Sequence, residues 1–214
     1  MSLSNQQASL DNPIKFHAEW KGGNGEWRLY NFQTEEVSFT KKNFSVLILD
    51  EYIGVRGYDS TAESGIISNN IKNSAGVVTV RNKKNMQLDE GPYSEVKLRM
   101  KSYGGKYAKV LYGVLLVKGK PTDLIVIDVV GSASQEYMDK FKPMKSYNSV
   151  GMVITFGANP EQQKKGATKY YIPTMEFERS VDDAVKAECV TIDSDTLQPY
   201  LAQFSTDSPK KDTQ

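Results

Sequence analysis

Cations and tyrosines stand beside an apolar run in the segment KSYGGKYAKVLYGVLL, residues 101–116. Binding an unpaired nucleic-acid strand requires positive charge for its phosphates and flat aromatic rings for its bases. In a strand from Lys106, alternation places Lys106 and Tyr112 on one face and Tyr107 and Lys109 on the other. We expect Tyr112 in the core beside Val110. Tyr107 and Lys109 are then ligand contacts or, in the alternative, an ordinary solvent-exposed edge.

The chain contains few residues of the types that commonly serve as catalytic nucleophiles, bases or zinc ligands. The chain has one histidine, His17, and one cysteine, Cys189, so one chain cannot assemble a His/Cys zinc cluster. The segment GGNGEW, residues 22–27, lacks the spacing of a dinucleotide-binding fingerprint and is expected to be a loop. We expect no catalytic residue, no metal and no cofactor. The weaker alternative is a hydrolase whose metal is held by carboxylates that lack calcium-loop spacing: Asp50, Glu51, Asp59 and Glu63.

Charge is distributed unevenly along a chain whose formal net charge is only +1. Between Lys72 and Lys120 there are eleven lysines and arginines against three carboxylates, whereas Glu176 to Asp195 holds seven carboxylates against two cations. This asymmetry predicts a basic surface in the middle of the chain and an acidic flank, expected as a solvated helix and turn. The alternative is that these charges are solvated faces that cluster only in sequence.

Length, cysteine content and the distribution of apolar residues indicate how the chain is stabilised and in which compartment it is expected. A chain of 214 residues can bury a substantial core without disulfides, and Cys189 has no partner for an intrachain bridge. No run approaches the roughly 18 to 20 apolar residues that span a bilayer, and residues 1–13 lack a signal-peptide pattern. We therefore expect a cytoplasmic protein that does not engage a membrane.

Strands dominate the expected elements. The segment Phe44 to Asp59 has the strongest β pattern, and we expect its Gly54 and Gly57 to mark a bend or bulge. Residues 106–117 and 124–130 predict a hairpin, and residues 93–104 predict a helix that ends at Gly104. Further strands are expected within residues 27–32, 66–69, 76–84, 149–157 and 168–177, helices within 132–142 and 194–204, and a polar loop at 158–167.

These elements predict a β-rich, mainly antiparallel fold with a few short helices, arranged as an elaborated barrel like the oligonucleotide- and oligosaccharide-binding (OB) fold. A sandwich is the alternative. We expect one nucleic-acid-binding domain over residues 13–204, with a C-terminal elaboration. Residues 1–12 are expected to be a disordered arm and residues 205–214 a disordered tail.

A resemblance to a known family is carried by three runs. They are FSVLILDEYIGVRGYDSTAESGIISNNI, then VVTVRNKKN, then SEVKLRMKSYGGKYAKVLYGVLL, which together span about residues 44–128. This region resembles the central portion of phage-encoded single-stranded DNA-binding proteins, with a Leu-Asp pair, a Gly-Tyr step, a Ser-Gly-Ile segment and a Gly-Gly-Lys-Tyr hairpin. The resemblance implies an OB-type barrel and these nucleic-acid contacts: Tyr58, Arg81, Lys83, Lys84, Lys106 and Tyr107.

The resemblance also implies a function. We expect a non-catalytic protein that coats single-stranded DNA with little sequence preference during phage replication or recombination in the host cytoplasm, with RNA as an alternative ligand. Related binders often end in an acidic tail that recruits replication or recombination enzymes, but this chain ends in SPKKDTQ. The alternative from another class is a β-rich virion or assembly protein without a nucleic-acid site, whose tyrosines fill subunit interfaces.

Overall fold

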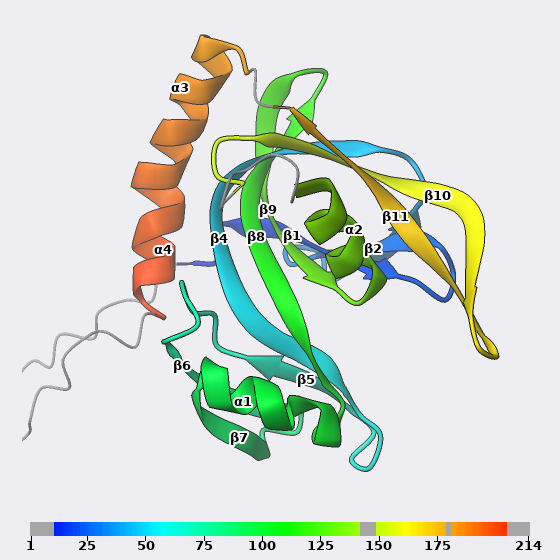
Figure 1. The fold of residues 1–214 in the computed structure, drawn as a ribbon. Helices are drawn as coiled ribbons and strands as arrows, with labels where there is room; N and C mark the ends of the chain where they lie inside the picture. Colours follow the sequence, from blue (N-terminus) through cyan, green and yellow to red (C-terminus); the bar gives the residue numbers. More distant parts are fainter. Residues whose placement is uncertain (1–10, 142–148, 179–180, 205–214) are drawn as a thin grey trace, which may run out of the picture.

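The structure is a computed structural model that describes residues 11–141, 149–178 and 181–204. The expected terminal arm and tail lie largely outside these residues. The described strands are β1 (Ile14–Lys21), β2 (Glu26–Asn31), β3 (Val37–Thr40), β4 (Phe44–Asp59), β5 (Ser64–Ser68), β6 (Val77–Asn82), β7 (Gln87–Pro92), β8 (Gly105–Val117), β9 (Lys120–Val130), β10 (Val153–Lys165) and β11 (Thr168–Glu178) (Figure 1). The helical segments are α1 (Tyr93–Arg99), η1 (Met100–Tyr103), α2 (Ser132–Phe141), α3 (Asp183–Ile192), a π-helical turn η3 (Asp193–Leu197) and α4 (Gln198–Ala202).

The β-rich, mainly antiparallel prediction is confirmed. All described strands belong to one sheet in the order β3-β2-β1-β9-β8-β4-β5-β6-β7, and β10 joins β4 and β11. Of the strand pairs in the described part of the chain, only β1 with β9 is parallel. The sheet does not close within the described residues, so the barrel part of the expectation is corrected. The reason lies in β4: one edge pairs with β10 over residues 44–47 and with β5 over residues 56–59, which splits the sheet into two branches.

Strand β4 has the predicted bounds, but its irregularity lies elsewhere. The pairing register with β8 shifts between Ile48 and Asp50, which places the bulge at Leu49. Gly57 instead permits a close approach, since a Cβ atom there would lie 2.2 Å from the carbonyl oxygen of Gly104. The expected bend at Gly54 and Gly57 is therefore corrected to a bulge five residues earlier than the first of them.

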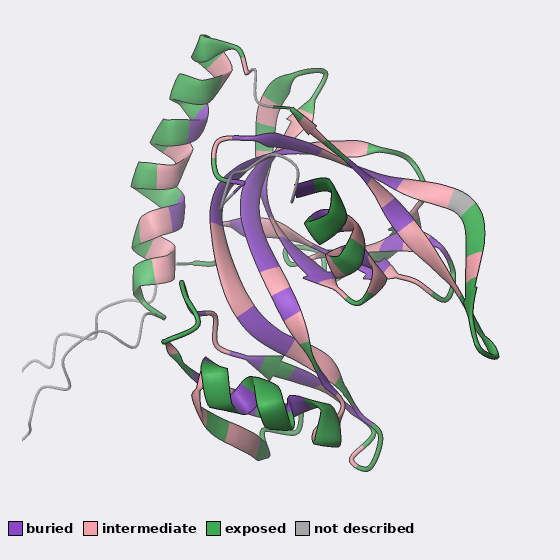
Figure 2. Cartoon of the chain, viewed as in Figure 1, coloured by how far each residue is buried: buried purple, intermediate pink, exposed green. Residues whose placement is uncertain are grey.

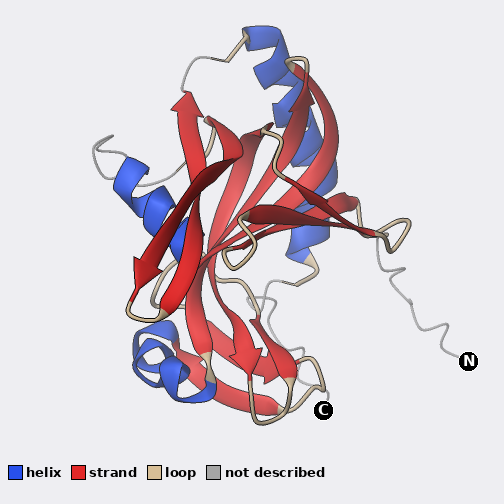
Figure 3. Cartoon of the chain, turned by 90° about the vertical axis from the view of Figure 1, so that its right-hand side faces the viewer, coloured by secondary structure: helices blue, strands red, loops and turns tan. Residues whose placement is uncertain are grey.

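Both faces of the central strands are buried. On β8, Leu111 enters a core with α2, while Val110 and Tyr112 enter a second core with α3 and α4. Helices α2 and α3 accordingly lie on opposite sides of the strands (Figures 1 and 3). This double coverage explains the continuous apolar runs in β4, β8 and β9. A third core lies among β4, β5, β6 and α1 at the other end of the molecule.

Residues next to the helices explain where several helices begin and end. Helix α1 and η1 cover the expected residues 93–103, and Gly104 ends them with φ 86°. The acidic segment does form a helix, α3, where Asp182 accepts hydrogen bonds from the backbone N–H groups of Ala184 and Val185. Among the described helices, none combines the length and the apolar character needed to cross a bilayer.

The expected polar loop at residues 158–167 is corrected. Most of it is strand, because β10 continues to Lys165 and pairs with β11 up to Lys165 and Thr168. Only Gly166 and Ala167 form the turn, and Gly166 has φ 61°, as two-residue hairpin turns require. The result is a long hairpin whose outer part is exposed (Figure 2).

Candidate nucleic-acid interface

A groove of about 2030 Å³ runs over the sheet face that also carries the second core. Its walls come from β1 and β2, from β4 to β6, and from α4 and the β10–β11 hairpin. Seven lysines and arginines line it against only two carboxylates, Glu19 and Asp128. Its aromatic lining residues are Trp20, Tyr30, Phe32, Tyr52, Tyr58, Tyr112, Tyr170, Tyr200 and Phe204. The groove therefore joins an excess of positive charge to many rings.

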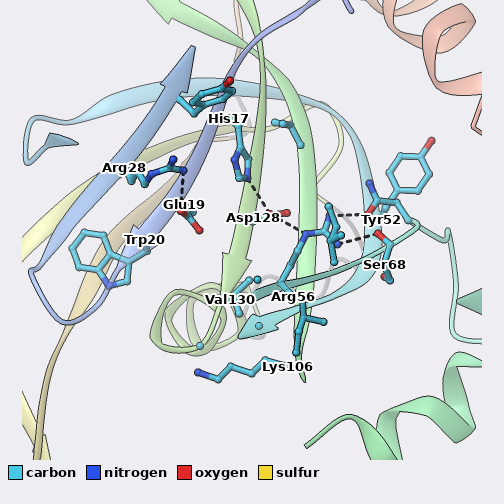
Figure 4. Close-up of a pocket in the computed structure, with 18 of the residues that line it drawn as sticks. His17, Glu19, Trp20, Arg28, Tyr52, Arg56, Ser68, Lys106, Asp128 and Val130 are labelled. Carbon is cyan, nitrogen blue, oxygen red and sulfur yellow. Dashed lines mark hydrogen bonds and ion pairs between the residues drawn. The ribbon is translucent and has the colours of Figure 1, made fainter. Parts of the chain in front are cut away.

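Side chains fill the space above Gly54 on β4, where an added Cβ would lie 2.9 Å from Arg56 Nη1 and 3.1 Å from Asn70 Oδ1. Gly54 pairs with Ala108 on β8, which is buried and in turn pairs with Val130 on β9. Val130 lines the groove together with Trp20 and Lys106 (Figure 4).

Ion pairs fix the centre of the groove (Figure 4). One carboxylate oxygen of Asp128, Oδ2, accepts hydrogen bonds from His17 Nε2 at 3.0 Å and from Arg56 Nε at 2.9 Å. Burial opposes the charged form of Asp128, but the attraction of Arg56 and His17 outweighs it and holds the pKa of this carboxyl below its usual value. The Arg56 guanidinium also donates to the carbonyl oxygens of Val55 and Ser68. The guanidinium of Arg56 thus donates its hydrogen bonds to groups of the protein itself.

Tyr58 provides an open ring at one end of the groove. Its side chain is 58% exposed, and its cross-strand neighbour on β5 is Gly65. The backbone N–H of Tyr58 donates to the Gly104 carbonyl at 3.4 Å, so glycines flank the residue on both sides. Lys83 lies across Gly65, where its Cε is 3.2 Å from the position of an added Cβ. Tyr58 therefore offers a bare aromatic face next to a lysine.

The structure brings three of the sequence-predicted residues together. Tyr58, Lys83 and Lys106 all line the groove. Within the described chain no carboxylate lies within 4 Å of either lysine, so neither forms an ion pair. Arg81 is exposed on the same face, because it pairs with Ile67, which pairs with Arg56.

Arg81 does not line the groove, and the other three predicted residues also lie outside it. The Lys84 ammonium donates to the Ala62 carbonyl at 2.6 Å. Lys109 pairs with Glu51 at 2.5 Å on the opposite face of β8. Tyr107 also points to that face, where it packs edge-on against Tyr93 and burial raises its pKa to about 12. The alternation predicted for β8 is thus correct, but the face that meets the groove is the one with Lys106.

The remaining cations of the groove are largely paired. Lys21 and Arg28 both bind Glu19, at 2.6 and 3.1 Å. Burial raises the pKa of Glu19, but these cations outweigh it and the pKa is lowered. Lys72 binds Asp50 and lies 4.0 Å from the ring centre of Tyr52. Among the residues that the structure describes, the groove cations without an ion pair are therefore Lys83, Lys106 and Lys169.

Sequence reasoning missed the aromatic end of the groove on β1 to β3. Tyr30 and Phe32 line it, and Arg28 pairs with Phe39, which is 54% exposed on the same face. The alternation of β2 already places Arg28, Tyr30 and Phe32 on one side of that strand. What the sequence lacks is a sign that β1 inserts between β2 and β9 and so extends the face.

Comparisons with known proteins give no identification. No family model, no curated protein and no solved structure matches this chain. Among the described residues, no group of three or more His, Cys, Asp or Glu side chains is placed to hold a metal ion. The interpretation of the groove therefore depends on its own geometry and charge.

Proposed function

We propose that the groove binds single-stranded DNA without catalysis and with little sequence preference. The observation that carries this proposal is the exposed ring of Tyr58 beside Lys83, near the unpaired Lys106. In this arrangement a base stacks on the ring, which is worth ~1 to 3 kcal/mol, while the two ammonium groups bind adjacent phosphates. RNA, which offers the same phosphates and base faces, is the alternative ligand.

An unpaired strand fits this groove better than a duplex does. In a duplex each base face is covered by its stacked neighbours, whereas a single strand can present its faces to Tyr58 at one end and to Tyr30 and Phe32 at the other. At the centre, the Arg56 guanidinium is bonded to Asp128, to the carbonyl oxygens of Val55 and Ser68 and to Asn70, and His17 Nε2 is bonded to Asp128. Stacking and charge then dominate, which accounts for weak sequence preference.

The resemblance of residues 44–128 to phage-encoded single-stranded DNA-binding proteins adds a biological setting to this proposal. On that basis the protein protects transient single strands during phage replication or recombination in the host cytoplasm. Replication or recombination enzymes are the proposed partners.

The test is a titration of a fluorescent (dT) oligonucleotide, of about 20 nucleotides, at several salt concentrations. We expect saturable binding that weakens steeply as salt rises and strongly exceeds binding to a duplex of equal length. A variant with Lys83→Gln and Lys106→Gln should lower the slope of log K against log salt by about 1.4, since each phosphate contact to a single strand contributes ~0.7. A variant with Lys118→Gln and Lys120→Gln, two exposed lysines outside the groove, is the matched control of equal charge change.

Absence of binding at low salt would contradict the proposal. If the protein instead self-associates with rising concentration in sedimentation runs, the assembly alternative is favoured. Divalent-ion-dependent cleavage of the oligonucleotide would favour the hydrolase.

A further inference from the structure

The hairpin formed by β10 and β11 carries three exposed lysines at its outer end, and the proposed function does not yet use them. Lys164 and Lys165 precede the turn and Lys169 follows it. Lys164 lies directly opposite Lys169 in the antiparallel register. Like charges in directly opposed positions destabilise a hairpin, and within the described chain no carboxylate lies within 4 Å of these lysines. An anionic partner would remove this repulsion.

Tyr171 fixes the hairpin against the glycine-rich loop between β1 and β2. Its backbone N–H donates to the Gly22 carbonyl at 2.8 Å, and its own carbonyl accepts from Trp20 Nε1 at 3.0 Å and from Ser132 Oγ at 2.9 Å. Its ring covers Gly25, where an added Cβ would lie 2.8 Å from the ring. The segment GGNGEW therefore packs against this hairpin and determines the position of its outer end.

This contact places Lys169, with Lys164 paired opposite it, at the edge of the groove. Thr168, Lys169 and Tyr170 line it together with Gly22 and Ser132. Val130 on β9 pairs with Ala108 on the antiparallel strand β8. Ser132 comes two residues after Val130 and Lys106 two residues before Ala108, so Ser132 and Lys106 lie at the same level. The hairpin therefore flanks the end of the groove to which Lys106 belongs.

We propose that the outer part of this hairpin, residues 162–170, is a second phosphate-binding element that holds the backbone of the same single strand beyond Lys106. This inference rests on the proposed function. Lys164 and Lys169, which share one face of the hairpin, bind successive phosphates, and Lys165, which leaves the opposite face beside the turn, binds the strand where it passes the tip. Tyr170 borders the path between these lysines and the groove. The chemistry recognised is a polyanionic backbone, without contact to base edges.

Lysines on a hairpin also have a purely protective role, because within the described residues β10 is the only strand that pairs with β11, and the part of β11 before Tyr171 has no other strand beside it. Charged side chains on an edge strand prevent pairing with other molecules. This role predicts no effect of the lysines on DNA affinity, so a binding experiment separates the two.

The experiment compares two full-length variants of equal charge change. The first carries Lys164→Gln, Lys165→Gln and Lys169→Gln. The control carries Lys118→Gln, Lys120→Gln and Lys140→Gln, three exposed lysines that do not line the groove. The probe is the same fluorescent (dT) oligonucleotide at salt concentrations from about 50 to 300 mM, and thermal melting verifies that both variants are folded.

We expect the hairpin variant to lower the slope of log K against log salt by about 2 and to bind roughly 10- to 100-fold more weakly at the lowest salt. The control should keep the wild-type slope. If both variants share the wild-type slope while the wild-type protein binds, the hairpin proposal is overturned and the function stands. If the wild-type protein does not bind the oligonucleotide at all, both proposals fall together.

Discussion

Lys106 and Arg56 lie directly opposite each other on β8 and β4, yet only Arg56 has a carboxylate partner among the described residues. Arg56 is held by Asp128 and has a side chain 13% exposed, whereas Lys106 is exposed and unpaired. Two like charges in adjacent positions thus take different roles. Arg56 stabilises the floor of the groove, and Lys106 remains available to an external anion.

Tyr58→Ala should weaken oligonucleotide binding with little change in fold stability. The ring is 58% exposed and flanked by glycines, so its removal costs the stacked base, ~1 to 3 kcal/mol or about 5- to 150-fold in affinity, but little packing. The (dT) titration and a urea denaturation curve measure the two quantities. Tyr58→Phe keeps the ring and should bind like the wild type. Equal affinity of the Ala and Phe variants would remove Tyr58 from the site.

Lys109→Met should lower stability and leave DNA binding unchanged. Its ammonium pairs with Glu51 where both side chains are well buried, 15% and 11% exposed, and loss of one partner of such a pair costs about 3 kcal/mol. Adding Glu51→Gln should recover part of the loss, because the remaining charge is also removed. A lower salt slope for Lys109→Met with unaltered unfolding free energy would contradict the structural role and return Lys109 to the site.

Lys109 illustrates how far the sequence leads in predicting this site. Alternation along β8 correctly separates Lys106 and Tyr112 from Tyr107 and Lys109. Which face is open depends on contacts far away in sequence. On one face of β8, Lys109 is largely buried in an ion pair with Glu51, and on the other face α4 borders the groove. No local pattern contains that information.

The same distinction between local and distant causes holds for the fold. The bounds of β4 and β8 and the end of β9 follow from apolar runs and turn residues close in the chain, whereas β9 begins at Lys120, four residues before its predicted start, because Lys120 already pairs with Val117. Strand β1 has a mixed sequence, IKFHAEWK, and pairs on one edge with β2, next in the chain, and on the other with β9, more than a hundred residues later. The outer part of β10 is polar and is strand because β11 returns beside it.

Gly57→Ala should destabilise the end of β4 that carries Tyr58. An added Cβ would lie 2.2 Å from the Gly104 carbonyl oxygen, and this backbone atom can move only if the β4–β8 pairing opens. We expect a loss of about 1 to 3 kcal/mol in unfolding free energy, measured in urea, together with weaker (dT) binding because Tyr58 is adjacent. Gly23→Ala is the matched control, since nothing lies within 4 Å of its added Cβ. Equal stability of the two variants would mean that the approach at Gly57 is not needed.

Acid should remove the contribution of Asp128 to stability. Its pKa in the folded protein lies below the value near 3.9 expected when unfolded, because burial is outweighed by Arg56 and His17. A lowered carboxyl pKa stabilises the fold at pH above the unfolded value, and this contribution is lost as pH falls through the folded value. Asp128→Asn leaves Arg56 buried without its counter-charge, so it should cost about 3 kcal/mol at pH 7.

The difference between wild type and Asp128→Asn should therefore shrink in urea unfolding as the pH falls from about 5 to 2. Glu19, Asp59 and Asp89 also have lowered pKa values, so the wild type and the variant share the rest of the acid dependence. Subtracting the two curves isolates Asp128. A difference that stays constant over this range would show that the carboxylate and Arg56 are not coupled, and the floor of the groove would then owe its order to packing alone.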